Sequence, residues 1–305
     1  MIALLLRRLL WMLATLWIVF TVSFFLMRTV PGGPLDSERV LDPEIEANQR
    51  ARFNLDLPVW QQYLIELGRT ARGDLGYSFK LGDFSVNEII AQGLPISAAL
   101  GILALLFALA LGLAAGIVSA VWRGTALDLV LMSAATVGIA LPNFVIAGIL
   151  IILLVFLVPL FPAAGWGAPE QLVLPAFCLG APYAAYIARL TRTGMLDVLG
   201  QDYIRTAYAK GLRTPRVVWR HALRAALLPV VSFLGPAIAG ILTGSLVVEQ
   251  IFAIPGLGMH FIQAATQRDY TLAMGLVLLY TALLYTMNLV VDVSYSILDP
   301  RVKLE

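Results

Sequence analysis

Six apolar runs dominate the chain, and each is long enough to cross a lipid bilayer. They lie at about residues 9–27, 96–121, 129–158, 172–190, 225–248 and 272–298. A transmembrane helix needs roughly 20 mostly apolar residues, because each helical residue adds about 1.5 Å of length. Charged residues make up 13% of the chain, compared with about 25% in a soluble domain. The sequence therefore predicts an all-α polytopic membrane protein with six transmembrane helices.

The first apolar run follows Arg7 and Arg8, as the core of a secretion signal would. It is of spanning length, however, and it ends at Arg28 and PGGP without a small-residue cleavage site. We expect an uncleaved first transmembrane helix over residues 1–29.

The distribution of basic residues predicts the orientation. If both termini are cytoplasmic, most of the 21 Lys and Arg side chains lie on the inner face, and most acids lie in the segment 30–93. This asymmetry follows the positive-inside rule. The segment 30–93 contains Pro-Gly turns, a helix-compatible stretch at 43–54 and aromatic residues at Trp60 and Tyr63. We expect it to be a folded periplasmic loop.

A basic segment interrupts the apolar pattern between the fourth and fifth runs. Residues 202–229 read DYIRTAYAKGLRTPRVVWRHALRAALLP, with six Arg or Lys side chains and one acid. Residues 195–210 are compatible with a helix, and Gly211 is a natural C-terminal stop. Thr214 suits the N-cap of a second helix and Pro215 its first position. The pattern predicts a helix, a tight turn and a second helix on the cytoplasmic side.

Three interpretations of this segment compete. The cations alone would enforce topology and contact lipid head groups, which leaves the Gly and Thr-Pro positions unexplained. A DNA-binding helix-turn-helix has a similar outline, but these helices continue into apolar runs and are too tethered to enter a major groove. A docking element for a cytoplasmic protein explains both the charge and the turn.

The segment resembles the cytoplasmic EAA loop of permease subunits in bacterial ABC importers, with Ala207, Gly211 and His221 in register. The variant RTAYAKGL…RHALR…LLP is typical of the peptide/nickel group. Four other stretches are similar to that family's motifs: FNLDLPVWQQY…GDLGYSF, GSLVVEQIFAIPGLG, NLVVDV and LDPR. By this resemblance, which covers essentially the whole chain, the protein is identified as a member of the family.

The resemblance implies the type I ABC importer permease fold with a cytoplasmic coupling helix in the loop 203–224. Residues 94–305 would form a core permease domain with five of the transmembrane helices. This sequence has Arg205 at the position of the family's glutamate and Arg224 at that of its late proline, so contacts of those two residues are not carried over. The residues implied to dock an ATPase are Arg205, Thr206, Ala207, Lys210, Gly211, Leu212, Arg213, Thr214, Pro215 and Arg216.

The resemblance also implies cargo and partners. ERVLDPEIEAN and GDLGYSFKLGDFSVNEII resemble members that carry oligopeptides, whereas relatives carry dipeptides, glutathione or nickel. The expected partners are a homologous second permease, two ABC ATPase subunits, a periplasmic or lipid-anchored peptide-binding protein, peptide and membrane lipid, with no nucleic acid. The expected location is the bacterial inner membrane. An ATP-independent channel or secondary transporter remains an alternative that leaves the basic segment without a role.

Catalytic motifs are absent from the sequence. A P-loop needs Gly-Lys followed by Ser or Thr, and none of the three lysines, Lys80, Lys210 and Lys303, follows a glycine. Two histidines and the single Cys178 show no metal-ligand spacing, and no GxSxG elbow occurs. We expect a non-catalytic subunit without a metal or cofactor of its own, with ATP and Mg bound by the partner ATPases.

Polar residues and helix breakers within the apolar runs are candidates for the translocation path or its gate. Each also has a structural interpretation: an amide holding a kink, a carboxylate partnering a cation, or a turn at the surface. The candidates are Pro142, Asn143, Thr243, Ser245, Glu249, Pro255 and Gly256. Two small-residue patterns, Gly112-x-x-x-Gly116 and Gly240-x-x-x-Gly244, predict close helix crossings.

Overall fold

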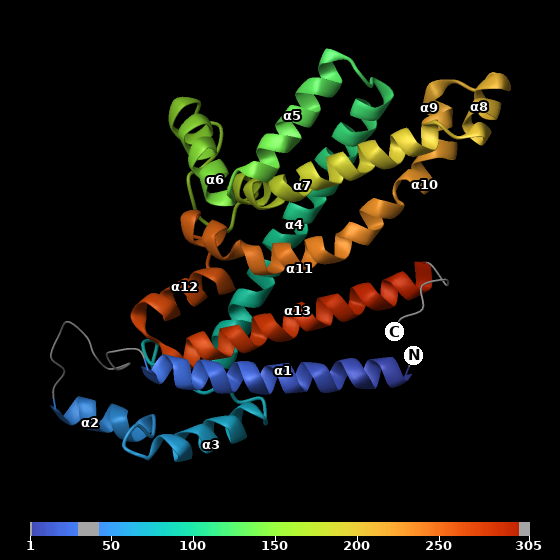
Figure 1. Cartoon of the computed structure of the whole chain (residues 1–305). Helices are drawn as coiled ribbons and strands as arrows, with labels where there is room; N and C mark the ends of the chain where they lie inside the picture. The colour runs from blue at the N-terminus through green and yellow to red at the C-terminus, as the bar shows by residue number, and fades with distance from the viewer. Residues whose placement is uncertain (1, 30–42, 299–305) are drawn as a thin grey trace. The chain divides into compact units, whose positions relative to one another are not determined.

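The computed structural model describes residues 2–29 and 43–298, and their side chains except at 2–5, 43, 45–46, 242–244 and 291–298. Over these ranges the chain is helical, with no β-strand beyond a single bridge between Tyr77 and Ser85. The LDPR motif at 298–301 lies mostly outside the described residues. The helices, with π-helical turns marked η, are α1 (Ile2–Thr29), α2 (Pro43–Arg52), α3 (Val59–Thr70), α4 (Val86–Val121), α5 (Ala126–Ala140), α6 (Asn143–Ile151), η1 (Ile152–Leu157), α7 (Glu170–Leu199), α8 (Asp202–Ala209), α9 (Thr214–Val217), η2 (Val218–Ala222), α10 (Leu223–Ala226), α11 (Leu228–Ile251), α12 (Leu257–Gln267) and α13 (Tyr270–Leu298) (Figure 1).

Four helices, α1, α4, α7 and α13, are long and apolar enough to cross a membrane by themselves. Two further spans exist if each of two bent helix pairs counts as one, which gives up to six. The pair α5 and α6 bends by 112° at Leu141–Pro142, and the pair α9–α10 and α11 bends by 55° near Leu227. The third predicted span is therefore a sharply broken one, because Pro142 cannot continue the helix of the residues before it.

The chain divides into two compact units, Met1–Ile96 with Pro255–Thr286, and Ser97–Ile254 with Met287–Glu305. In the second unit α7 is the central helix and contacts α5, α6, α10 and α11 (Figure 1). The Gly112-x-x-x-Gly116 pattern allows α4 to cross α7 closely. A Cβ at Gly112 would lie 2.6 Å from the carbonyl oxygen of Ala184, and one at Gly116 would lie 2.6 Å from that of Ala188. The predicted close crossing is confirmed at these two positions.

The first unit is built on α1 and the N-terminal part of α13, joined by a 2.8 Å hydrogen bond between the hydroxyls of Thr15 and Tyr285. Its loop after α3 is fastened by Asp269, the residue before α13. The Asp269 carboxylate caps α13 by accepting from the Leu272 amide at 3.1 Å. It also accepts from the Phe79 amide at 3.1 Å, the Lys80 amide at 3.2 Å and the Ser78 hydroxyl. One buried carboxylate thus joins two segments that lie far apart in the sequence.

Candidate functional site: the α8–α10 hairpin

The basic segment forms a helical hairpin, residues 202–226, at one end of α7 (Figure 1). Its first helix, α8, is separate from α7. The predicted single helix over 195–210 is wrong in this respect, because the chain turns at Gly200 and Gln201 before α8 begins at Asp202. Glycine has a low helix propensity, and Gly200 here marks the C-terminal cap of α7.

Two apolar side chains hold α8 against the rest of the unit. Ile204 and Ala207 are buried, whereas the neighbouring side chains of α8 are exposed. They pack with Ala120 of α4, Met195 of α7 and Val217 of α9 in one apolar cluster. Their spacing of three residues places both on the same face of the helix. The other face of α8 is presented outward.

Gly211 ends α8 as the sequence predicts. Its φ is +77°, a left-handed conformation that glycine adopts without a Cβ penalty. The amide of Gly211 donates to the carbonyl of Tyr208 at 2.9 Å, and that of Leu212 donates to Ala207 at 3.3 Å. These two bonds form a Schellman motif, which satisfies the terminal carbonyls of α8 and turns the chain sharply.

The second helix of the hairpin starts one residue earlier than predicted. Arg213, rather than Thr214, occupies the N-cap of α9, and Pro215 lies in its first turn. No side-chain hydrogen bond caps this helix end, so the Thr214 hydroxyl does not have the predicted capping role. The amide of Val217 donates to the Arg213 carbonyl at 3.1 Å and closes the turn instead.

The outward surface of the hairpin combines positive charge with aromatic rings. All six of its cations are exposed, and so are Tyr203, Tyr208 and Trp219, the last at 68%. The single acid, Asp202, pairs with Arg205 at 3.4 Å, but both side chains are largely in solvent. Exposed Arg and aromatic side chains around a rigid turn are typical of a protein contact. The exposed cations are Arg205, Lys210, Arg213, Arg216, Arg220 and Arg224.

The base of the hairpin is packed backbone against backbone. A Cβ at Gly194 of α7 would lie only 2.3 Å from the carbonyl oxygen of Ala226 in α10. Ala226 is buried in the same apolar cluster as Ile204 and Ala207. The hairpin is therefore held at both ends, by the α8 contacts and by this close approach.

A partly buried ion pair lies two helical turns before the end of α7. Arg192 donates from Nε at 2.8 Å and from Nη2 at 2.9 Å to the two oxygens of Asp128 in α5. The carboxylate also accepts from the Gly124 amide at 2.9 Å and from the Ser119 hydroxyl. Two donors thus join α5 to α7, and two more tie the same carboxylate to the turn between α4 and α5.

The predicted path residues lie in three places. Pro142 is the N-cap of α6, with Asn143 following it at the 112° break. Ser245 and Glu249 lie one turn apart on α11 and are both buried, with Glu249 at 0% exposure. Pro255 and Gly256 lie just before α12, where Gly256 is the N-cap. Thr243 belongs to α11, but its side chain is outside the described residues.

Three residues of the site and its supports were not predicted: Asp128, Arg192 and Asp269. A signal existed for two of them. Thr125-x-x-Asp128 before an apolar run is a capping-box pattern, and the Asp128 amide does donate to the Thr125 hydroxyl oxygen at 3.4 Å. Asp269 before the last apolar run has the position of an N-cap. Nothing in the local sequence indicates that Arg192 would meet Asp128, 64 residues away.

The comparisons with known proteins agree on the family. The model of the family described as "Binding-protein-dependent transport system inner membrane component" matches residues 112–304. The oligopeptide transport system permease protein OppB of Haemophilus influenzae is 44% identical over 97% of this chain and 98% of its own length. OppB of Escherichia coli is 43% identical over 99% of this chain and 100% of its own. The dipeptide transport system permease protein DppB of Bacillus subtilis is 44% identical over 96% and 95%.

Solved structures share the fold. The MetNI methionine ABC transporter in an inward-facing conformation contains a chain that matches with a TM-score of 0.57 and 19% identity, over 67% of this chain and 93% of its own. An amino acid ABC transporter matches with a TM-score of 0.51 and 19% identity, over 68% and 92%. The predicted fold, that of a type I ABC importer permease, is confirmed.

Proposed function

This chain belongs to the family of binding-protein-dependent transport system inner membrane components, and on that premise we propose that it carries oligopeptides across the bacterial inner membrane. It does so together with a homologous second permease, with which it forms the pathway. Both termini and the α8–α10 hairpin then face the cytoplasm, and the segment 30–93 faces the periplasm, where a peptide-binding protein delivers cargo.

The observation that carries the proposal is the α8–α10 hairpin itself. Ile204 and Ala207 bind it to α4 and α7, and its cations and aromatic rings remain exposed. A soluble partner that docks on this surface would push on α7 and α10 directly, because α10 meets α7 at Gly194 without an intervening side chain. Such a rigid contact transmits a movement, whereas a flexible loop absorbs it.

We propose two copies of an ABC ATPase as the partners that drive transport, one under each permease. This chain has no Gly-Lys pair for a P-loop, so the phosphates of ATP are bound elsewhere. The exposed cations of the hairpin would match acidic side chains in a cleft of the partner, and its exposed aromatic rings would match apolar side chains there. ATP and Mg belong to those partners, and this subunit is non-catalytic.

Oligopeptides are the proposed cargo because two oligopeptide permeases are similar to this chain over nearly its whole length. The dipeptide permease of Bacillus subtilis is equally similar, so dipeptides are the second candidate. In either case the binding protein supplies most of the selectivity.

We propose Pro142, Asn143, Thr243, Ser245 and Glu249 as residues of the pathway, and Pro255 with Gly256 as part of its outer gate. Ser245 and Glu249 are buried in this conformation, so they meet cargo only after α11 moves. An ionisable residue inside a membrane-spanning segment is a candidate for a functional role. Glu249→Gln is expected to change transport more than it changes the amount of assembled complex.

The docking proposal is tested with Gly211→Val. A β-branched residue at φ +77° is strained by roughly 1–2 kcal/mol, so the turn after α8 opens. Gly73→Val is the matched control, because Gly73 has φ +81° and equally open surroundings but lies in the loop after α3. We expect Gly211→Val to lose co-purifying ATPase and uptake, and Gly73→Val to keep the ATPase bound.

Charge-reversal variants give a second test of the docking proposal. Arg213→Glu with Arg216→Glu is expected to release the ATPase, whereas Arg72→Glu, also an exposed cation, is not. If the ATPase stays bound and active with both hairpin variants, the docking proposal is wrong.

A further inference from the structure

The helix α3 has an inverted distribution of polarity. Trp60 is 61% exposed and Leu64 is 55% exposed, whereas Gln62 is only 6% exposed. Leu57 and Val59 are exposed as well. A helix on the surface of a water-soluble region buries its apolar stripe and exposes its polar one. The arrangement of α3 is the reverse, which suits a helix whose outer face is in contact with hydrocarbon.

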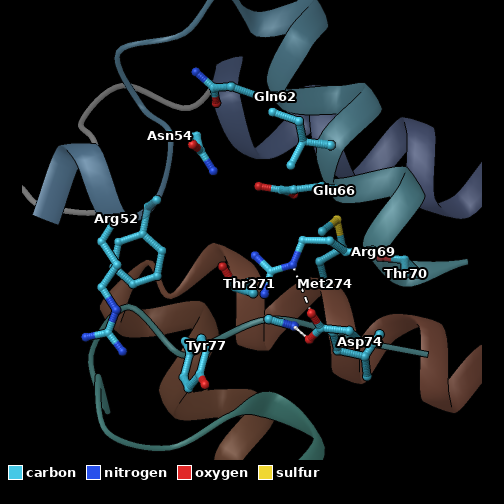
Figure 2. A pocket seen from close by; sticks show the side chains of 14 residues that line it. Arg52, Asn54, Gln62, Glu66, Arg69, Thr70, Asp74, Tyr77, Thr271 and Met274 are labelled. Carbon is cyan, nitrogen blue, oxygen red and sulfur yellow. Dashed lines mark hydrogen bonds and ion pairs between the residues drawn. The ribbon is translucent and has the colours of Figure 1, made fainter. Parts of the chain in front are cut away.

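The inward face of α3 is a polar stripe formed by Gln62, Glu66 and Arg69, spaced four and three residues apart. Figure 2 shows these side chains around a small cavity of about 40 Å³ that the loop at Asp74 and Tyr77 and the start of α13 also line. Arg69 donates to Asp74 at 3.0 Å. Burial raises the pKa of the Glu66 carboxyl, although the guanidinium of Arg28 opposes the shift. Gln62 and Glu66 thus point into the protein, and Arg69 lies at the edge of the cavity with its side chain 37% exposed.

The depth of α3 follows from its contacts with α1, whose apolar span is Leu6–Thr29. The hydroxyl of Tyr63 lies 2.9 Å from the Thr21 hydroxyl and 3.1 Å from Nε1 of Trp17. At about 1.5 Å per residue, Thr21 is roughly 12 Å from the end of this span along the helix axis. A tyrosine side chain reaches only part of that distance. The backbone of α3 at Tyr63 therefore lies alongside the span and not beyond its end.

Arg28 supports the same placement. Its guanidinium lies 3.5 Å from the centroid of the Phe24 ring and donates to Gln62 at 2.9 Å and to Glu66 at 3.4 Å. A cation in the last turn of an apolar span needs polar partners at that level of the membrane. The inward face of α3 supplies them.

The exposed face of α3 is continuous with that of α1. The rings of Phe25 and Tyr63 stack with 5.7 Å between their centroids. Phe25, Val22 and Leu26 of α1 are themselves exposed and belong to its apolar span. Lipid that covers these side chains would also reach the neighbouring side chains of α3.

We propose that α3 is an interfacial membrane helix that lies in the lipid leaflet at the C-terminal end of α1, with Leu57, Trp60 and Leu64 among the acyl chains. Interfacial helices bury their apolar face about 5–10 Å into the boundary between head groups and acyl chains. Tryptophan is enriched at this level. The inference rests on the contacts within one unit and holds for either cargo and for either orientation of the chain.

The test uses the assembled importer in phospholipid vesicles, with a fluorescent bimane label on a single introduced cysteine. Trp60→Cys and Leu64→Cys place the label on the exposed face of α3, and Lys80→Cys places it on an exposed residue in the following loop. The native Cys178 is fully buried, so the unaltered protein measures background labelling. Quenching is measured with a lipid that carries a nitroxide near its head group, and separately with aqueous iodide.

We expect the labels at 60 and 64 to lose fluorescence to the nitroxide lipid, to resist iodide and to emit at shorter wavelength than the label at 80. Quenching by iodide and not by the lipid would place the face in water and overturn the proposal. Protection from both quenchers would show that a protein covers the face, which would overturn it equally. Either result leaves the ATPase-docking role of the α8–α10 hairpin untouched, because that role is measured separately.

Discussion

Arg192 of α7 and Asp128 of α5 form a bidentate ion pair, in which Nε and Nη2 of the arginine donate to the two carboxylate oxygens at 2.8 and 2.9 Å. The Asp128 side chain is 8% exposed and that of Arg192 is 27% exposed. The pair lies close to the end of α7 from which the α8–α10 hairpin continues. It therefore ties α5, and the turn before it, to the helix that leads into the proposed docking surface.

Removing the cation from this pair should uncouple the subunit. Arg192→Gln leaves a largely buried carboxylate without its counter-ion, which is more damaging than losing a surface pair. We expect peptide uptake to fall by about tenfold or more, within the usual range of coupling between sites, while the ATPase remains bound. The measurement is ATP hydrolysed per peptide transported in vesicles.

Arg192→Lys is the matched variant, because it keeps the charge and loses the two-point geometry. Its uptake should lie between those of the wild type and Arg192→Gln. An unchanged ratio of ATP to peptide in Arg192→Gln would show that the pair only stabilises the fold.

Gly194→Ala should displace α10. The added methyl would lie 2.3 Å from the Ala226 carbonyl oxygen, and the atom in its way is backbone and cannot rotate aside. Overpacking of this kind costs about 1–3 kcal/mol of stability. The melting temperature of the purified complex should fall, and less ATPase should bind to it.

Gly200→Ala is the control, because its Cβ would have ordinary contacts at 3.7 Å. A loss of stability as large in Gly200→Ala as in Gly194→Ala would contradict the close-approach argument.

Asp269→Asn should free the loop after α3. The carboxylate is 1% exposed and accepts four hydrogen bonds, and an amide directs two donors at groups that are themselves donors. The expected cost is on the order of 2 kcal/mol. Hydrogen exchange should rise at the amides of Phe79 and Lys80.

Asp83→Asn, an exposed change in the same loop, should stay within about 0.5 kcal/mol of the wild type. Exchange at Phe79 that is equally slow in wild type and Asp269→Asn would show that the loop is held by other contacts.

The helix α12 should weaken in acid. Burial lowers the pKa of His260, whose Nδ1 has no hydrogen-bond partner among the described residues. In the unfolded state the pKa of histidine is about 6.5, higher than in folded α12. As the pH falls below about 6.5, the unfolded state therefore binds the proton more readily than the folded state, and the folded helix loses stability until the pH reaches the lower folded pKa. Well above that value both states are neutral and the effect vanishes.

Hydrogen exchange of α12 should therefore be faster at a pH of about 5.5 than at about 7.5 after correction for intrinsic rates. His260→Gln should remove the difference. The same pH response in that variant would assign the effect to another group.

Much of the fold follows from local sequence. The apolar runs predict the long helices, Gly211 predicts the end of α8, and the glycines at 112 and 116 predict the close crossing with α7. Each of these features depends on the conformation or size of single residues, and these properties can be read from the local sequence.

The remaining features depend on contacts between distant residues. Ser78 and Asp269 are 191 positions apart, and only the packing of the first unit brings them together. The inverted polarity of α3 was hidden for a related reason. Its residues are amphipathic by sequence, but which face points inward is decided by contacts with α1, where Arg28 donates to Gln62 and the Thr21 hydroxyl bonds to that of Tyr63. The angle at Pro142 is likewise set by the packing of α6 on α7.

An uptake assay tests most directly whether this subunit carries oligopeptides within an ATP-driven importer. Labelled di-, tri- and pentapeptides, with nickel as control, are supplied to a deletion strain with and without the restored gene. We predict that restoration recovers uptake of the tri- and pentapeptides, and that this recovery is lost with Gly211→Val. Recovery of dipeptide or nickel uptake alone would contradict the proposed cargo, and full recovery with Gly211→Val would contradict the proposed coupling.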